Sequence, residues 1–385
     1  MAPCRSTRWM WYPSPWRTPV RSLDHGKLRG HQLPLRPLFD LPRLPMTLRI
    51  AINGYGRIGR CFLRALGESP HHHAMAVVAI NEPADLESMA YLTRFDSTHG
   101  RFPGPVELEG RALRIAGRTI AVSHASRPDE VDWGQLGIDL LIEASGRYTR
   151  RQELETFLSA GCPRLLLSQP GQSADDVDST VVFGFNESIL EGGERIVSAA
   201  SCTTNAIVPL LAAVDGHFGI ERAFLTTLHS VMNDQPLIDG YHHPDLRRTR
   251  SAMQSMIPVS TGLARGIERL LPELAGRIDA KAIRIPVANV SAIELVTSLA
   301  RPADRETINA LLQDLAAGSA DRIGWTQEPH ASIDFVHSPQ SAIIDGSQTR
   351  LLGEQLLKIF VWFDNEWGFA NRMVDIAAYW GRRLP

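Results

Sequence analysis

Cys202 is the residue of this chain most open to chemistry, because small and hydroxylic residues surround it. Residues 198–205 read Ser-Ala-Ala-Ser-Cys-Thr-Thr-Asn, and the apolar run at 206–211 predicts that a helix begins here. A free cysteine has a pKa of about 8.5, so a thiolate at neutral pH needs a helix N-terminus or a neighbouring base. The helix would provide the first, and His229, at the end of the strand-like residues 223–228, could provide the second. A buried inert cysteine and a histidine satisfied elsewhere remain the alternative.

A dinucleotide-binding pattern lies earlier in the chain. Residues 48–53 read as a buried strand, Gly54, Gly56 and Gly59 follow with the spacing G-x-G-x-x-G, and residues 60–66 have a helical pattern. Gly54 permits a tight turn, Gly56 lets the backbone approach a pyrophosphate, and Gly59 lets helix and strand pack closely. The pattern predicts nucleotide binding, and the alternative is a purely structural glycine turn.

A second strand, residues 76–81, ends at Glu82. An acidic side chain at that point would accept hydrogen bonds from the adenosine ribose and repel a 2′-phosphate, so it favours NAD over NADP. Arg57 and Ile58 lie inside the glycine loop, at the helix N-terminus that would face the pyrophosphate. The glycines alone are a weak indication of an NAD site. The prediction is more specific here because a strand, the glycine loop, a helix, a second strand and a carboxylate follow one another in this order.

Four segments together resemble the glyceraldehyde-3-phosphate dehydrogenase superfamily: I-N-G-Y-G-R-I-G-R at 52–60, D-S-T-H-G-R-F at 96–102, A-S-C-T-T-N at 200–205 and W-F-D-N-E-W-G-F at 362–369. The resemblance runs from about residue 46 to the C-terminus. It implies NAD-dependent oxidation of a phosphorylated aldehyde, with Cys202 as nucleophile and His229 as its base. Thiol attack on an aldehyde gives an oxyanion that needs donors, for which the Cys202 N–H and protonated His229 are candidates.

The resemblance and the local chemistry also assign cofactor contacts to Ser145 and Gly146, after the strand-like residues 138–143, and to Ser168, at the end of another strand. Nucleotides bind at the carboxyl edge of such sheets. Asn365 matches the asparagine that fixes the nicotinamide carboxamide in this family. Its alternative role is an Asx turn before the final helix.

Within the superfamily, the sequence resembles the branch that oxidises D-erythrose 4-phosphate more than the glycolytic branch. Met232 stands where glycolytic members carry a threonine whose hydroxyl helps to hold the substrate phosphate, and a thioether cannot donate that hydrogen bond. Residues 81–85 and 238–250 also resemble the erythrose-phosphate branch. The Ser-Thr-Gly of 260–262 instead resembles an anion site of the glycolytic enzyme, which remains the alternative. The first interpretation implies 4-phosphoerythronate as product, release of the acyl-enzyme by water, and a role in pyridoxal 5′-phosphate biosynthesis.

Arg248 and Arg284 are expected to bind the substrate phosphate, since a guanidinium group bonds two oxygens of a dianion at once. Arg284 lies in an otherwise apolar strand, where an unpaired charge is costly to bury unless a ligand or a carboxylate meets it. For Arg247 and Arg250, a solvated face or a subunit salt bridge is equally open. Further residues expected near the substrate or a second anion are Ser201, Thr203, Thr261 and Gly262.

The pattern predicts an α/β protein of two domains. Residues 46–200 alternate strands and helices, as in a doubly wound parallel Rossmann domain that binds NAD, and residues 201–363 should form an α+β catalytic domain on a mostly antiparallel sheet. Residues 364–385 should return to the NAD-binding domain as a helix. Residues 1–45 are rich in Pro, Arg and Trp and lack periodicity; we expect translation assigned from an upstream start codon or, second, a disordered extension.

Composition indicates a soluble enzyme. The 385 residues are 44% hydrophobic and carry a formal charge of −2, which argues against electrostatic binding to nucleic acid or membranes. The four cysteines have neither disulfide nor metal-ligand spacing, so we expect a cytoplasmic location and no metal, with the histidines of 71–73 in a solvated loop.

The family resemblance implies a homotetramer, because residues 231–256 resemble the loop that lines a neighbouring subunit's NAD site. A thiol hydrolase or acyltransferase and a non-catalytic binding protein are the alternatives from other classes.

Overall fold

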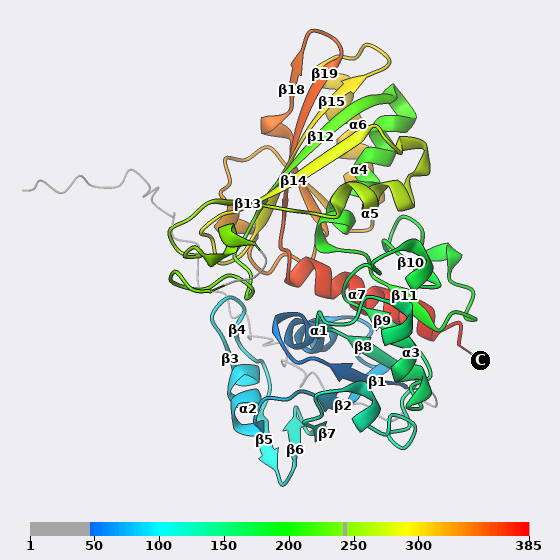
Figure 1. Ribbon diagram of the computed structural model, residues 1–385. Coiled ribbons are helices and arrows are strands. Elements are labelled where there is room, and N and C mark those ends of the chain that lie inside the picture. Colours follow the sequence, from blue (N-terminus) through cyan, green and yellow to red (C-terminus); the bar gives the residue numbers. More distant parts are fainter. Residues whose placement is uncertain (1–46, 242–244, 385) are drawn as a thin grey trace, which may run out of the picture. The chain divides into compact units, whose positions relative to one another are not determined.

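The structure is a computed structural model that describes residues 47–241 and 245–384. The expectations for residues 1–45 therefore lie outside the described part. Within it, the strands form two large sheets, each with a hydrophobic core of its own (Figure 1). None of the helices in this part combines the length and the apolar character that a membrane span requires.

The first sheet is doubly wound and largely parallel. Its strands follow the order β10-β11-β9-β8-β1-β2-β7-β6-β5, and only the β5-β6-β7 edge is antiparallel. Strand β1 is fully buried over its last four residues, as expected for a central strand covered on both faces. The strands are β1 (Leu48–Asn53), β2 (Met75–Asn81), β5 (Val106–Glu109), β6 (Ala112–Ile115), β7 (Arg118–Ser123), β8 (Leu140–Glu143), β9 (Leu165–Leu167), β10 (Ser179–Thr180) and β11 (Ile196–Ser198).

Helices α1 (Arg57–Glu68), α2 (Leu86–Arg94), α3 (Arg151–Ser159) and α7 (Trp367–Gly381) accompany this sheet, with a short β3–β4 ribbon (Phe95–Asp96 and Gly100–Arg101). Helix α7 packs against α1, and its buried side chains belong to the same core as those of β1 and α1. The C-terminal segment therefore contributes to the core that supports the glycine loop.

The second sheet is mostly antiparallel and follows the order β13-β14-β12-β15-β19-β17-β16, with β18 paired to β19. Its strands are β12 (Ile220–His229), β13 (Ile257–Val259), β14 (Ile278–Arg284), β15 (Ser291–Leu299), β16 (Ile323–Thr326), β17 (Ala342–Asp345), β18 (Arg350–Leu352) and β19 (Leu356–Phe363). Helices α4 (Cys202–Phe218), α5 (Leu263–Leu270) and α6 (Arg305–Gly318) bury apolar residues in its core. The predicted fold class is confirmed.

The histidine triplet of residues 71–73 lies in the turn between α1 and β2 but is not fully solvated. All three residues are partly buried, and His71 Nε2 lies 3.7 Å from Asp375 Oδ1 of helix α7. The turn packs against the C-terminal helix, which the local sequence does not show.

Candidate active site

Cys202 is the first residue of helix α4, so its thiol lies where the helix has N–H groups without intrahelical partners. The chain reaches this helix from β11 through Ala200, whose φ of 59° is unusual for a residue other than glycine. Ser201 then caps the helix, its hydroxyl accepting a hydrogen bond of 3.1 Å from the Thr204 N–H. This junction fixes the direction in which the Cys202 side chain leaves the backbone.

His229 ends strand β12, and its ring faces the thiol. The Sγ of Cys202 lies 3.9 Å from Nε2 of His229. The other ring nitrogen, Nδ1, lies 2.8 Å from the carbonyl oxygen of Ser230, which can only accept, so we assign the proton of the neutral ring to Nδ1. Nε2 is then left as an acceptor for the thiol proton, and the structure thus brings together the pair expected from the sequence.

The thiol and the imidazole rest in their neutral forms. Burial raises the pKa of Cys202 to about 12, although the backbone N–H groups of Thr203 and Cys202 act in the opposite direction. Burial also lowers the pKa of His229. The charge of nearby Arg284 acts in the same direction, and the hydrogen bond to Ser230 acts in the opposite direction. Both shifts favour the neutral pair, so proton transfer from Sγ to the facing Nε2 works against burial and depends on the backbone N–H groups at the start of α4 to stabilise the thiolate.

Asn365, which follows β19, is held by two serine hydroxyls. Ser230 Oγ donates to Asn365 Oδ1 at 2.9 Å, and Ser291 Oγ donates to the same oxygen at 2.8 Å. Because both bonds use the amide oxygen, the Nδ2 group is left to donate to a carboxamide oxygen. The Asx turn at the start of α7 is made by Asp364 rather than by Asn365. Sequence reasoning missed Ser230 and Ser291, although Ser230 directly follows His229.

The glycine loop borders a groove at the carboxyl ends of β1, β2 and β8, with a volume of about 180 Å³. A Cβ on Gly54, whose φ is 87°, would lie 2.5 Å from the backbone of Ser145, and a Cβ on Gly59 would lie 2.2 Å from the carbonyl oxygen of Gly54. A Cβ on Gly56 would meet nothing within 4 Å, because its backbone faces open space. These residues fit a dinucleotide, since the loop is packed tightly on the protein side and open where a pyrophosphate would approach.

Glu82 follows β2 and lines the same groove. Its Oε2 accepts a hydrogen bond of 2.7 Å from the Tyr55 N–H, and its Oε1 accepts one of 3.3 Å from the Ala84 N–H. Arg127 and Arg147 line the groove as well. The Glu82 carboxylate thus holds the glycine loop and also has oxygens available to a ribose.

A buried polar network supports the groove from below. Asn81 Nδ2 donates to Asn53 Oδ1 at 2.8 Å, and Asn53 Nδ2 donates to Glu143 Oε2 at 2.5 Å. The other carboxylate oxygen of Glu143 accepts from the N–H and the hydroxyl of Ser145. Burial raises the pKa of Glu143 to about 7, although these donors oppose the shift. Sequence reasoning missed Asn53, Asn81 and Glu143, which position the loop that carries Ser145.

Two expected cofactor residues lie beside the groove rather than in its lining. Gly146 follows Ser145 with a φ of 73°, and the N–H of Ser168 donates to the Glu143 carbonyl oxygen at 2.9 Å. Both belong to the loops at the carboxyl ends of β8 and β9, where nucleotides bind in sheets of this kind.

Arg57 was expected to contact the cofactor, but its side chain is not part of the groove lining. Its guanidinium donates to Asp96 at 2.5 Å and to both carboxylate oxygens of Glu366, with 2.8 Å between Nε and Oε1. Two largely buried carboxylates hold the arginine side chain there, because leaving them unpaired would be costly. Only the Arg57 backbone at the start of α1 remains for a phosphate. Ile58 packs against the core of the first sheet.

Cys61, His99 and Glu366 bring three potential metal ligands within 4.8 Å of one another. The Arg57 guanidinium already pairs with Glu366, and burial raises the pKa of Cys61 well above its usual range. A cation would have to displace that guanidinium and also the proton of a deeply buried thiol. The cluster is therefore explained by packing between α1, the residues around His99 and the start of α7.

Arg284 lies beside His229, because β12 and β14 pair in parallel with these two residues opposite each other. Asp234 pairs with both terminal nitrogens of Arg284, at 2.5 and 2.9 Å, and also accepts from Arg248 Nη1 at 2.9 Å. The Sδ of Met232 lies 3.6 Å from Arg284 Nη2. The two arginines expected to bind phosphate are thus brought together, with a carboxylate between them that sequence reasoning did not identify.

The remaining expected substrate residues lie at helix starts. Thr203 Oγ1 is 3.0 Å from Ser201 Oγ at the start of α4. Thr261 Oγ1 accepts from the backbone at the start of α5, where Gly262 is the capping residue. Within the described residues, neither Thr261 nor Gly262 is hydrogen-bonded to the arginine pair, so these two groups of expected residues are not joined directly.

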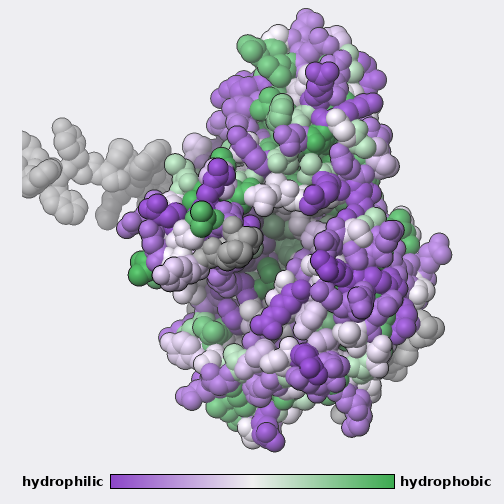
Figure 2. All heavy atoms as spheres, viewed as in Figure 1, coloured by the Kyte–Doolittle hydropathy of each residue, from purple (hydrophilic) through white to green (hydrophobic). Residues whose placement is uncertain are grey.

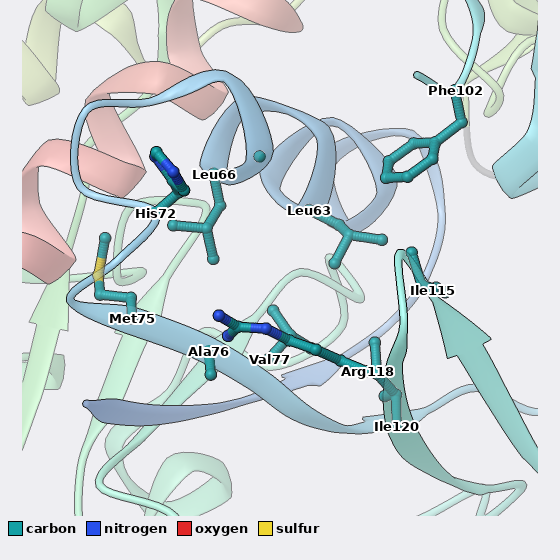
Figure 3. Close-up of a pocket in the computed structure, with 11 residues that line it drawn as sticks. Leu63, Leu66, His72, Met75, Ala76, Val77, Phe102, Ile115, Arg118 and Ile120 are labelled. Carbon is teal, nitrogen blue, oxygen red and sulfur yellow. The ribbon is translucent and has the colours of Figure 1, made fainter. Parts of the chain in front are cut away.

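A separate cavity of about 40 Å³ lies between α1 and strands β2, β6 and β7 (Figure 3). Its lining is mostly apolar, and the Arg118 side chain extends along it. None of its lining residues belongs to the groove or to the Cys202–His229 pair, and it is far too small for a dinucleotide. It is a packing void of the first core.

Comparison with known protein families matches two long segments of the described chain. Residues 48–151 match the NAD binding domain of glyceraldehyde 3-phosphate dehydrogenase, and residues 201–365 match its C-terminal domain. The first match contains the glycine loop, Glu82 and Ser145, and the second begins at Ser201 and ends at Asn365. NAD is therefore the cofactor of the groove. The chain belongs to the glyceraldehyde-3-phosphate dehydrogenase family and is an NAD-dependent oxidoreductase of phosphorylated aldehydes.

Proposed function

We propose that this protein oxidises D-erythrose 4-phosphate to 4-phosphoerythronate with NAD, by way of a thioester on Cys202 that is released by water. The observation that carries this proposal is the thioether of Met232, which lies 3.6 Å from Arg284 Nη2, where a hydroxyl would offer a phosphate one more donor. The product would feed pyridoxal 5′-phosphate biosynthesis. Glycolytic oxidation of glyceraldehyde 3-phosphate is the second candidate, favoured by Thr261 and Gly262 at the start of α5.

The Cys202–His229 pair can perform each proton transfer of this reaction. Cys202 gives its proton to His229 Nε2, and its sulfur attacks the aldehyde carbon. The backbone N–H groups at the start of α4 and the protonated His229 stabilise the oxyanion, which then takes the proton and becomes a hydroxyl. The chemistry that NAD supplies is acceptance of a hydride from this carbon. As the hydride leaves, His229 removes the hydroxyl proton, and a thioester remains on Cys202.

The same base, His229, acts again when the product is released. His229 first gives up its proton to solvent and then removes a proton from a water that adds to the thioester carbon. Breakage of the carbon–sulfur bond returns the thiol of Cys202 and yields a carboxylic acid. This sequence needs no inorganic phosphate, whereas the glycolytic reaction uses phosphate as the acyl acceptor.

The length of the substrate is the reason for expecting a changed phosphate site. Erythrose 4-phosphate is one carbon longer than glyceraldehyde 3-phosphate, so its phosphate lies further from Cys202 when the aldehyde is in place. A site that keeps Arg248, Thr261 and Arg284 but has Met232 in place of a hydroxyl donor suits a phosphate that has shifted.

The test measures NADH formation from erythrose 4-phosphate without inorganic phosphate and from glyceraldehyde 3-phosphate with it. We expect the first to be preferred. Met232→Thr should improve glyceraldehyde 3-phosphate relative to erythrose 4-phosphate by about tenfold or more, because one hydrogen bond to a charged partner contributes roughly 1.5–3 kcal/mol. Leu352→Thr, at an exposed apolar residue of β18 outside residues 231–256, is the matched control. Strict dependence on inorganic phosphate with glyceraldehyde 3-phosphate preferred would establish the glycolytic alternative.

We also propose that the protein is a homotetramer in which residues 231–256 contact a neighbouring copy. Large apolar side chains of this segment are exposed, and hydrophobic side chains lie on the surface beside β13 (Figure 2). The most exposed are Tyr241, Leu246, Ile238, Met256 and Leu237. Sedimentation at four times the monomer mass would support the proposal, with a smaller species for the double variant Leu237→Asp, Ile238→Asp. A monomeric unmodified protein would contradict it.

A cytoplasmic location is part of the same proposal. Cys61, Cys162 and Cys202 are free thiols in the described part of the chain, which fits a reducing compartment. Fractionation of cells that express the full chain would test this location, and recovery from an oxidising compartment would contradict it.

A further inference from the structure

Asp234 places a carboxylate where the substrate phosphate is expected. Its two oxygens accept from the two terminal nitrogens of Arg284 at 2.5 and 2.9 Å, and one of them also accepts from Arg248 at 2.9 Å. A phosphate would use the same planar donors in the same bidentate manner. Carboxylate and phosphate therefore compete for one face of Arg284.

The charges around this face cancel in the structure. Arg248 Nε also lies 3.5 Å from Asp245 Oδ2, so two guanidinium groups meet two carboxylates and the sum is zero. Burial alone would raise the pKa of Asp234, but the hydrogen bond and charge of Arg284 and the charge of Arg248 outweigh it and lower this pKa. Asp234 is thus ionised at neutral pH, and the cluster offers little net attraction to a dianion until Asp234 moves.

The two partners differ in how easily they can move. The Arg284 side chain is 6% exposed and belongs to strand β14, whereas the Asp234 side chain is 39% exposed and belongs to the segment that follows β12. Turning Asp234 toward solvent exposes a carboxylate to water, where it is well hydrated. Moving Arg284 would leave a buried charge unpaired, which is costly.

We propose that Asp234 is an internal anion that the phosphate group of the substrate displaces from Arg284, so that an anion binds at this face only by replacing the two hydrogen bonds between Arg284 and Asp234. The proposal rests on the proposed function in one respect, namely that the displacing group is the phosphate of a sugar substrate. A residue that only positioned Arg284 would have the opposite effect on anion binding, because its loss would weaken the site.

The test uses sulfate, a tetrahedral dianion, titrated into the full chain by calorimetry in the presence of NAD. Asp234→Asn should bind sulfate about fivefold to tenfold more tightly than the unmodified protein, because one negative charge in contact with the site is removed. KM for the oxidised sugar phosphate should fall by a similar factor, with kcat changed less than about twofold. Glu155→Gln is the matched control, since Glu155 forms an exposed ion pair with Arg151 at 3.0 Å on helix α3, and it should leave both values unchanged.

The outcomes separate this inference from the proposed function. Asp234→Ser serves as a second variant in case Asp234→Asn folds poorly, and circular dichroism checks both. Sulfate binding that is unchanged or weaker in the folded variants overturns the inference, and so does a raised KM. If the unmodified protein oxidises neither sugar phosphate, the proposed function fails, whereas the sulfate titration still decides whether Asp234 occupies an anion site.

Discussion

Glu82 offers the sharpest test of how the groove selects its cofactor. Glu82→Gln removes the negative charge but leaves a side-chain oxygen that can accept from the Tyr55 N–H, as Oε2 of Glu82 does at 2.7 Å. Glu82→Ala removes both the charge and the acceptor. Comparison of the two variants therefore separates charge repulsion against a 2′-phosphate from support of the glycine loop.

The size of the change in cofactor preference depends on the distance between the Glu82 carboxylate and a bound 2′-phosphate. Two unit charges 4 Å apart interact by about 1 kcal/mol in water and about 4 kcal/mol at the effective dielectric of a protein surface. Glu82 is half-buried at the edge of an open groove, so we expect a value between these two limits, about 2 kcal/mol. Glu82→Gln should accordingly change the NADP-to-NAD ratio of kcat/KM by about 30-fold in favour of NADP.

The assay is the rate of reduction of each cofactor at a fixed aldehyde concentration, together with fluorescence titrations of NADH and NADPH. Glu87→Gln, an exposed glutamate in the first turn of α2, is the matched control and should leave the ratio unchanged. Glu82→Ala should also weaken NADH binding, because it frees the Tyr55 N–H. An unchanged ratio in Glu82→Gln, or equal use of both cofactors by the unmodified protein, would refute the reasoning.

Two further predictions concern the proton-transfer groups. Cys202→Ser should abolish aldehyde oxidation while NADH titration still shows binding, and turnover by this variant would contradict the role of Cys202 as nucleophile. His229→Asn should lower kcat by about 10²-fold or more with a smaller effect on KM, and a change in KM alone would contradict the role of His229 as base. Because the pKa of Glu143 is raised from 4.5 to about 7, the folded state keeps a proton that the unfolded state releases, and the free energy of unfolding should fall by up to about 3 kcal/mol as pH rises from 4.5 to 7. Denaturant unfolding at several pH values should show this slope in the unmodified protein and a flatter profile in Glu143→Gln, and equal profiles would contradict it.

The features that the sequence predicted well are those fixed by neighbouring residues. The glycine loop between β1 and α1 depends on local conformation and on the absence of side chains, so its residues identify it directly. The same is true of Cys202 at the start of α4 and of His229 at the end of β12, where a change of hydrophobic period marks the boundary. The sequence also predicted the two kinds of sheet, because alternating strands and helices require parallel crossovers.

The contacts that the sequence did not predict join distant strands. Ser291 reaches Asn365 because β15 and β19 pair antiparallel, with Ser291 opposite Phe363 at the start of their register. Asn53 reaches Glu143 because β1 and β8 are neighbours in the sheet, although 90 positions separate them in the chain. Sheet order and register decide such contacts, and a single sequence contains no local signal for either.

The partners of charged side chains are the contacts that a single sequence predicts least well. An arginine pairs with whichever carboxylate the fold places beside it, and that carboxylate can be distant in the chain. Arg57 lies in the glycine loop, so the sequence favoured a phosphate, but the return of the C-terminal segment places Glu366 against its guanidinium. Arg284 was expected to meet either a ligand or a carboxylate, and the segment after β12 brings Asp234 to it. The two pairs differ in what a ligand could do to them. Glu366 is largely buried at the start of α7, whereas Asp234 is partly exposed, so only the second pair can open to admit an anion without unpacking a core.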